Sequence, residues 1–325
     1  MSTKSKAAAA EEKKPITLSS EHVPLSYRIK KDLQRNGMIY AMLIPVLVYY
    51  AIFKFGPMFG LYISFIDYKP ARGIFGSKFV GLKWFKSFFS DYYFGRLLIN
   101  TVRIAVADLL TFPLPVILAL LINELKNKKF SKTAQTLLYV PHFISTVVIC
   151  GIVITLTSST GAITEVLHNF FGIKEQALLN NPSNFLPIYI LTELWQTLGW
   201  NSIIYLAALT SIDPGLHEAA MIDGAGKLRR IWHIDLPGIG ETIAIMLILK
   251  FGSMMSTGFE KIYSMQADLN LSVSEVISTY VYKMGMMNNK YSYSAAISLF
   301  NNVINFTLLI LVNKASSKLS GSSLW

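Results

Sequence analysis

The chain has 325 residues, of which 52% are hydrophobic and only 15% are charged, whereas soluble globular proteins carry about 25% charged residues. This composition disfavours an ordinary soluble enzyme. Thirty Lys and Arg face nineteen Asp and Glu, giving a formal net charge of +11, which in so apolar a chain favours a role in membrane topology over nucleic-acid binding. The single cysteine, Cys150, excludes an intramolecular disulfide framework and is expected to pack inside an apolar run.

The first 36 residues are polar, charged and rich in alanine. No apolar core precedes the first long apolar run, so these residues do not form a secretory signal peptide. We expect residues 1–36 to be a cytoplasmic tail that is largely disordered up to about residue 23.

Six apolar segments follow, and a helix needs about 20 residues to cross a bilayer. The first runs from about residue 38 to 66 and the last ends near residue 312; the four between them cover about residues 97–122, 134–156, 186–209 and 239–255. The fifth is short and contains Lys250, so a buried helix is its alternative reading. The sequence predicts a six-span domain over 37–316, followed by a cytoplasmic tail over 317–325.

Lys and Arg are distributed unevenly over the connecting segments. With the N-terminus inside, seventeen fall in cytoplasmic segments and nine in outer ones. Cytoplasmic loops carry the excess of these residues, so both termini are expected to face the cytoplasm. The outer loops, about 67–95, 158–185 and 258–294, are long and contain aromatics, which is typical of functional loops or loops with short structures of their own.

The cytoplasmic loop over 211–238 contains signals for two short helices. Asp213 can cap a helix that begins at Pro214 and runs to about residue 222, since proline is favoured at a first helical position. Asp223, Gly224 and Gly226 then break it. A second short helix is expected through Leu228, Ile231 and Trp232, with Pro237 preceding the fifth span.

The first of these helices carries a narrow apolar stripe whose side chains have little bulk. Leu216, Ala219 and Ala220 recur at helical spacing, with Glu218 beside them. Such a stripe allows another backbone to approach closely, which favours docking of a partner protein. An interfacial hairpin whose cations (Lys227, Arg229 and Arg230) contact lipid headgroups is an equal alternative on these residues alone.

The spacing of this loop resembles that of a known family. Glu218, Ala219, Ala220, Gly224, Ile234, Leu236 and Pro237 match the EAA motif of ABC importer permeases at every interval. The resemblance implies that the loop forms coupling helices in a groove of a cytoplasmic ATPase: Glu218 pairs with the ATPase, Ala219 and Ala220 pack in the groove, and Asp223 and Gly224 form the turn between the helices.

The resemblance covers nearly all of the chain after about residue 28 and looks closest to the LplB-type sugar permeases of carbohydrate-uptake importers. Stretches that carry it include GPMFGLYISFIDY over 56–68, YVPHFIS over 139–145 and ELWQTLGWNSIIYLAAL over 193–209. It implies a second homologous permease chain, two cytoplasmic ABC ATPase subunits, an extracellular solute-binding protein and a bacterial cytoplasmic membrane. ATP and magnesium belong to the ATPase partner, and no cofactor or nucleic acid is expected here. The chain lacks a P-loop, because the run through Gly224 and Lys227 misses its first glycine and its hydroxyl residue.

Ionisable residues at membrane depth are candidates for function by default. Arg103 and Asp108 lie in the second span and Lys250 in the fifth. Arg103 and Asp108 are five residues apart, a poor spacing for pairing on one helix; Lys250 and Arg103 are expected to pair with groups on another span or on the partner chain, or to contact cargo. A self-contained secondary transporter or channel that uses these three residues as an ion or proton relay is the alternative function. His142 is expected to be a packing residue rather than a metal ligand.

A sugar path needs aromatic faces together with amide or carboxylate groups. Such a mixture occurs in the fourth and sixth spans: Glu193, Trp195, Gln196, Asn201 and Tyr205, then Asn301, Asn302 and Asn305. Interfacial anchoring of Trp and helix–helix bonding of Asn are equal alternatives. The sequence thus predicts an all-α integral membrane protein that is the permease subunit of an ATP-driven importer of an oligosaccharide or glycoside, working by alternating access. The chain itself is not expected to be an enzyme, and no intramembrane catalytic motif is present.

Overall fold

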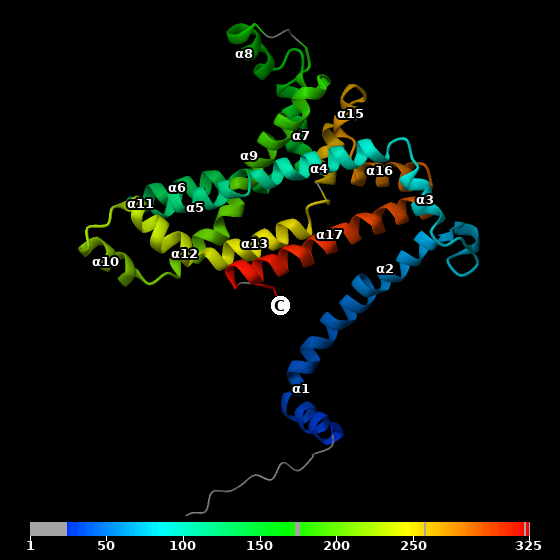
Figure 1. The fold of residues 1–325 in the computed structure, drawn as a ribbon, viewed down its shortest axis with the longest axis horizontal. Coiled ribbons are helices and arrows are strands. Elements are labelled where there is room, and N and C mark those ends of the chain that lie inside the picture. Colours follow the sequence, from blue (N-terminus) through cyan, green and yellow to red (C-terminus); the bar gives the residue numbers. More distant parts are fainter. Residues whose placement is uncertain (1–24, 173–175, 257, 322, 325) are drawn as a thin grey trace, which may run out of the picture. The chain divides into compact units, whose positions relative to one another are not determined.

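The computed structural model describes residues 25–172, 176–256, 258–321 and 323–324 (Figure 1). The part predicted to be disordered, up to about residue 23, lies outside the described residues. The chain divides into two compact units, residues 1–60 and 61–325, which are described separately.

The described part of the first unit is helical. It contains α1 (Leu25–Tyr50), a π-helical turn η1 (Ala51–Phe55) and α2 (Gly56–Met58). Residues 25–36, which were assigned to the tail but not to its disordered part, are helical: Leu25, Ile29 and Leu33 recur every four residues, a helical period. The backbone leaves helical geometry at Asn36, with φ −115° and ψ 21°, and the helix is kinked there.

The second unit is helical apart from one small hairpin. Its strands β1 (Ile66–Asp67) and β2 (Lys78–Phe79) pair antiparallel, Ile66 opposite Phe79. The helices are α3 (Lys83–Phe89), α4 (Phe94–Leu110), α5 (Pro113–Asn123), α6 (Lys128–Tyr139), α7 (Thr146–Leu156), α8 (Ala162–Phe171), α9 (Pro182–Thr210), α10 (Pro214–Ile222), α11 (Lys227–Arg230), α12 (Leu236–Gly238), α13 (Gly240–Gly252), α14 (Phe259–Met265), α15 (Leu271–Ser274), α16 (Ile277–Tyr282) and α17 (Tyr291–Ser320). Shorter 3-10 helices are η2 (Phe59–Phe65), η3 (Pro70–Arg72), η4 (Val140–Phe143), η5 (Leu178–Asn180) and η7 (Asp268–Asn270), and η6 (Ile231–Asp235) and η8 (Lys283–Met287) are π-helical.

The predicted third span is not one straight helix. The segments Lys128–Phe143 and Thr146–Leu156 meet at an angle of 94°. Pro141 has no N–H to donate, and Ser145 caps the new helix by accepting a hydrogen bond from the Val148 N–H at 3.4 Å. The predicted span over 134–156 thus consists of two helical segments, because these two residues end one helix and begin the next.

The other predicted spans correspond to helices, but their count stays a prediction. By length and apolar composition, three described segments qualify to cross a membrane, Lys31–Phe65, Phe94–Asn123 and Tyr291–Lys318, and the bent pair makes a possible fourth. Helix α9 has 29 residues but carries polar residues through its middle. Helix α13, with 13 residues, is short, as predicted. The sixth helix continues to Ser320, into residues predicted to be tail.

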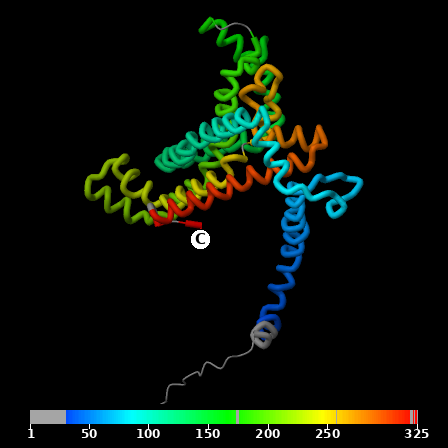
Figure 2. Tube along the Cα trace, turned by 45° about the vertical axis from the view of Figure 1, so that its right-hand side comes forward, coloured from blue at the N-terminus to red at the C-terminus, as the bar shows by residue number. Residues whose placement is uncertain are grey.

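Apolar packing holds the helices of the second unit together. Helix α5 packs on α9, and α13 lies beside α17 (Figures 1 and 2). Cys150 is buried in a cluster with Ile104, Phe185 and Ile262, which confirms its packing role. The cluster joins α4, α7, α9 and α14, so residues far apart in sequence share one core.

The loops that were predicted to be outer hold short helices of their own, as expected. Glu275 forms ion pairs with Arg96 at 2.5 Å and with Lys283 at 3.1 Å. Asp91 accepts hydrogen bonds from the hydroxyls of Tyr280 and Tyr293 at 2.9 and 2.6 Å. Burial opposes ionisation of Asp91, but the bonds from Tyr293, the Tyr93 backbone and Tyr280 outweigh it and lower its pKa.

Helices α6 and α9 approach most closely at Gly199. A β-carbon there would overlap the backbone carbonyl of Leu138. We expect Gly199→Ala to destabilise the protein by about 1–3 kcal/mol, since a packed interface does not accept an extra methyl group. Thermal unfolding of the purified complex measures this. Gly151→Ala in α7, with no atom within 4 Å of the new carbon, is the matched control and should be neutral or stabilising; equal unfolding temperatures for both variants would contradict the packing argument.

Candidate functional site

The loop over 211–238 contains the first predicted helix with the predicted ends. Asp213 caps α10 by accepting a hydrogen bond from the Gly215 N–H at 2.9 Å. Gly224 has φ +75°, a left-handed conformation that a β-carbon disfavours, and it ends the helix. In Figure 1, α10 lies at one end of the second unit, away from α8 and α15.

The second predicted helix is longer than the sequence indicated. After Gly226 the chain runs through α11, η6, α12 and α13 with a single break at Ile239. The π-helical turn Ile231–Asp235 accommodates Pro237, whose missing N–H would leave a gap in a regular α-helix. The loop is therefore continuous with the base of the fifth predicted span.

The surface of α10 is uncovered. Glu218 and Ala219 are exposed and Ala220 is half-buried, while the large apolar side chains Met221 and Ile222 are 53% and 87% exposed. Asp223 and Gly224 are exposed at the turn, and Pro237 is exposed at the base; Ile234 and Leu236 are half-buried. Exposed apolar residues in one short helix indicate a surface that a partner covers.

One charged contact lies within this loop, and a second attaches the loop to the rest of the second unit. His217 Nε2 of α10 lies 3.3 Å from Asp235 Oδ1, and Lys227 Nζ lies 3.1 Å from Glu124 Oε2, next to the C-terminal end of α5. Asp235 is 1% exposed, and neither of its side-chain oxygens has a hydrogen-bond partner within the described chain. Burial raises the pKa of this carboxyl, and His217 lowers it. His217 and Arg230 both favour the charged carboxylate, but burial outweighs them and the pKa of Asp235 is raised overall.

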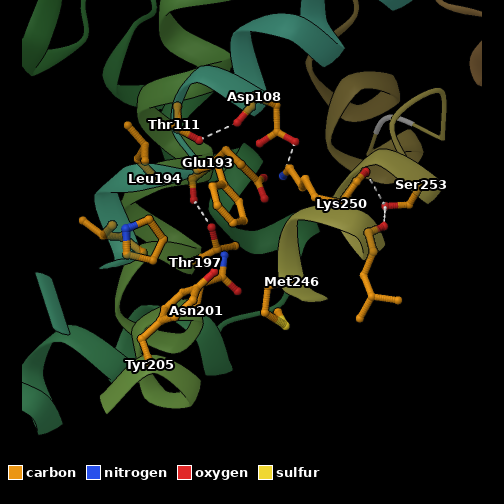
Figure 3. Close-up of a pocket in the computed structure, with 14 residues that line it drawn as sticks. Asp108, Thr111, Glu193, Leu194, Thr197, Asn201, Tyr205, Met246, Lys250 and Ser253 are labelled. Atoms are coloured by element: carbon orange, nitrogen blue, oxygen red, sulfur yellow. Dashed lines mark hydrogen bonds and ion pairs between the residues drawn. The ribbon is translucent and has the colours of Figure 1, made fainter. Parts of the chain in front are cut away.

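A cavity of about 260 Å³ lies between α4, α5, α9 and α13 (Figure 3). Asp108 of α4 and Lys250 of α13 point toward one another and form an ion pair. This confirms that Lys250 pairs with a group on another span. Asn201 and Tyr205 of α9 lie lower on the same wall in Figure 3.

Glu193 links this cavity to two neighbouring ones. It lines all three, whose volumes are about 260, 180 and 320 Å³. Its carboxylate forms an ion pair with Lys261 of α14, a residue that is only 4% exposed. The cavity wall thus reaches the outer loop through one acid–base pair.

The predicted path residues of α9 differ in which cavity they line. Glu193, Asn201 and Tyr205 line the central cavity. Gln196 lines a neighbouring cavity, but its amide donates to the Ile144 carbonyl at 3.2 Å. Trp195 is 50% exposed and is not among the residues that line these cavities.

The asparagines of the sixth predicted span lie elsewhere. Asn301 donates to the Met255 carbonyl at 3.2 Å, and Asn305 accepts from the Met255 N–H at 2.8 Å and donates to Ser256 Oγ at 2.8 Å. These amides fix the chain after α13, while Asn302 is exposed. These hydrogen bonds support the alternative interpretation of Asn301 and Asn305, in which the asparagines bind neighbouring segments. Their contact with cargo stays a prediction.

Several cavity residues were not singled out from the sequence. Thr197 completes a row with Glu193, Asn201 and Tyr205 at steps of four residues, a helical period that could have identified it. Thr111 follows α4, Met246 lies in α13 and Ser253 follows α13, and these residues gave no such signal. Lys261 is 68 residues from Glu193, a separation across which the sequence indicates no contact.

Two further predictions concern Arg103 and His142. Arg103 is exposed and is not among the residues lining the cavities, so Arg103, Asp108 and Lys250 do not form one cluster. His142 stacks on Trp200 with ring centroids 4.2 Å apart, which confirms a packing role. Within the described residues no group of His, Cys, Asp or Glu is arranged to hold a metal ion.

Most of the chain matches one known protein family. Residues 93–320, from just before α4 to the end of α17, match the family described as "Binding-protein-dependent transport system inner membrane component". The match includes the loop and every residue of the central cavity. The chain belongs to this family of permeases.

Named relatives match the permease over nearly its full length. Protein LplB of Bacillus subtilis (strain 168) is 42% identical over 295 residues, covering 90% of this chain and 92% of LplB. The polygalacturonan/rhamnogalacturonan transport system permease protein YteP of the same organism is 41% identical over 292 residues, covering 90% and 91%. The resemblance to LplB-type permeases is thereby confirmed.

Solved structures share the fold. A chain of a bacterial alginate ABC transporter, solved in complex with an alginate pentasaccharide-bound periplasmic protein, superposes with a TM-score of 0.84 at 36% identity, covering 91% of this permease and all of that chain. A chain from a bacterial ABC transporter involved in import of the acidic polysaccharide alginate gives a TM-score of 0.83 at 36% identity, covering 90% and 99%. These matches confirm the all-α permease fold.

The pair of His217 and Asp235 can be tested by substitution. His217→Ala leaves a buried carboxylate without its partner, which costs about 3–5 kcal/mol where both groups are fully buried; we expect less here because His217 is partly exposed. Limited proteolysis of the loop in the purified permease measures the effect. In the double variant His217→Ala, Asp235→Asn, the loop should regain much of its resistance to proteolysis, because no buried charge then remains.

The stability of the loop in His217→Ala should depend on pH. Without His217 the pKa of Asp235 rises further, so the folded loop retains its proton to a higher pH than the unfolded loop. Stability of His217→Ala should therefore fall as pH rises above the unfolded carboxyl pKa and recover on acidification. Equal proteolysis of the single and double variants at every pH would refute the assignment.

Proposed function

We propose that this permease is half of the membrane pore of an ATP-driven importer and that the loop over 211–238 couples it to a cytoplasmic ATPase. The observation that carries the proposal is the uncovered surface of α10, where Glu218 and Ala219 of the EAA motif are exposed beside Met221 and Ile222. An ATPase groove that receives α10 accounts both for the small residues and for the exposed apolar ones. ATP and magnesium are bound by that ATPase, and this chain carries no catalytic role.

The attachment of the loop indicates how movement reaches the cargo path. Lys227 ties the loop to Glu124 beyond α5, and His217 ties α10 to Asp235, which leads into α13. Residues of both α5 and α13 line the central cavity, among them Pro115 and Met246. A displacement of α10 on closure of the ATPase is thus transmitted to two walls of the cavity, as alternating access requires.

The cavity suits a saccharide. Phe112 and Tyr205 supply aromatic surface, while Thr111, Thr197 and Asn201 supply hydroxyl and amide groups, the combination that sugar rings require. The names of LplB-type relatives and the oligosaccharide in the neighbouring complex support an oligosaccharide or glycoside as cargo.

The assembly would contain further chains. We infer a second homologous permease, two ABC ATPase subunits and an extracellular solute-binding protein that delivers the cargo. The family description, a binding-protein-dependent inner membrane component, supports the binding protein and the bacterial cytoplasmic membrane. The excess of Lys and Arg in the segments assigned to the cytoplasm supports an orientation with both termini inside.

Glu218→Arg tests the coupling. The change places a positive charge where the ATPase groove is proposed to receive a negative one, so the variant should lose the ATPase on co-purification and lose ATP-dependent uptake of labelled sugar into vesicles, by at least about tenfold for a lost interaction of about 1.4 kcal/mol. The permease pair should remain folded, because Glu218 is exposed.

Glu241→Arg is the matched control. Glu241 is also exposed and lies in the first turn of α13, outside the loop, so this variant should retain the ATPase. Undiminished uptake by Glu218→Arg, or uptake by the wild type without ATP, would overturn the proposed coupling.

A further inference from the structure

We propose that the cargo path selects saccharides without net negative charge and disfavours uronate oligosaccharides. This inference rests on the proposed saccharide import and adds the charge class of the cargo. It follows from the charged side chains that line the central cavity and its two neighbours: Asp108, Glu193, Glu260, Lys250 and Lys261, with His142 beside them.

Both ammonium groups in this wall already have a carboxylate partner. Lys250 is paired with Asp108, and Lys261 is paired with Glu193. Glu260 is exposed and forms no ion pair with a described residue. The three carboxylates therefore outnumber the two ammonium groups, and the described wall offers no unpaired ammonium to an incoming anion.

The pair of Lys261 and Glu193 resists being opened by cargo. Lys261 is 4% exposed, so drawing it toward a uronate would leave Glu193 without its partner. Breaking a buried pair in this way is strongly unfavourable, because one charge is then left uncompensated. A uronate carboxylate would itself lose water in the cavity without gaining a cation.

Neutral hydroxyl groups meet a different surface. The hydroxyl oxygens of Thr111, Thr197 and Ser253, whose protons are donated to backbone carbonyls of their own turns, line the central cavity as acceptors. Asn201 and Tyr205 add groups that both donate and accept hydrogen bonds, and the aromatic ring of Phe112 lies among them. These groups can bind ring hydroxyls without disturbing either ion pair. The wall is thus complementary to an uncharged sugar.

The likeness to importers of acidic polysaccharides does not decide the charge of this cargo. The two neighbouring structures concern alginate and YteP is named for polygalacturonan and rhamnogalacturonan, at 36% and 41% identity. The shared fold fixes the cavity's position, whereas a few side chains in its wall fix its charge.

The test is a comparison of matched saccharides. Vesicles carrying the complete importer and its binding protein would be given mixed plant cell-wall oligosaccharides, neutral and uronate-containing, and the uronate fraction again after its carboxyl groups are reduced to alcohols. We expect ATP-dependent uptake of neutral sugars, little uptake of uronates, and entry of the carboxyl-reduced sugars. Uptake of uronates as fast as their reduced counterparts would overturn the charge selectivity while leaving saccharide import intact. Absence of ATP-dependent uptake of every fraction would instead overturn the proposed import, and the selectivity with it.

Substitutions separate the permease from its binding protein. Glu193→Gln frees the ammonium of Lys261 and should raise the ratio of uronate to neutral uptake on the order of tenfold, as one ion pair of about 1.4 kcal/mol would. Glu241→Gln makes the same change of charge at an exposed carboxylate that lines none of these cavities, and its ratio should change little. An equal rise in both variants would refute the role of the paired lysine.

Two more variants guard against misfolding. Glu193→Gln combined with Lys261→Met removes the pair as a unit, so the preference for neutral sugars should persist. Asp108→Asn frees Lys250 from a pair that is more exposed than that of Lys261 and should also admit uronates. If neither freed lysine raises uronate uptake in folded importer, the inference is wrong.

Discussion

The cost of burying a charge in an apolar chain is the constraint on which this structure depends. The three strongly buried carboxylate and ammonium groups of the described residues each lie beside a group that can carry the opposite charge: Asp235 beside His217, Lys261 beside Glu193, and Glu275 beside Arg96 and Lys283. An unpaired ion in such surroundings would be unstable. These pairs therefore help to fix which segments lie together, in the loop over 211–238, at the cavity and in the segment over 258–294.

Proline, glycine and capping residues divide runs of helix-forming residues into separate helices. Pro141 and Ser145 turn one predicted span into two segments at 94°, and Gly224 separates α10 from the helical run that leads into α13. At each of these positions a missing N–H, a side-chain cap or a left-handed backbone ends a helix that its apolar residues would otherwise continue.

The loop over 211–238 and the cavity are connected through the same two helices, α5 and α13. The loop is tied next to α5 through Glu124 and leads into α13 through Asp235, and both helices contribute to the cavity wall. The exposed face of α10 can therefore receive a partner while the attached side stays fixed to the core. A helix held on one side and free on the other is suited to transmit a displacement.

The sequence by itself determined the membrane class, the apolar segments, the ends of α10 and the family motif, because all of these depend on local composition and on spacing along one helix. The row Glu193, Asn201 and Tyr205 was also visible, since residues four apart share a helical face. Tertiary structure alone decided that Asp108 pairs with Lys250 and Glu193 with Lys261, and that Asn301 and Asn305 bond to the backbone at Met255. The physical reason is that a side chain's partner across a fold depends on how helices pack, and packing brings together residues whose separation in sequence carries no signal.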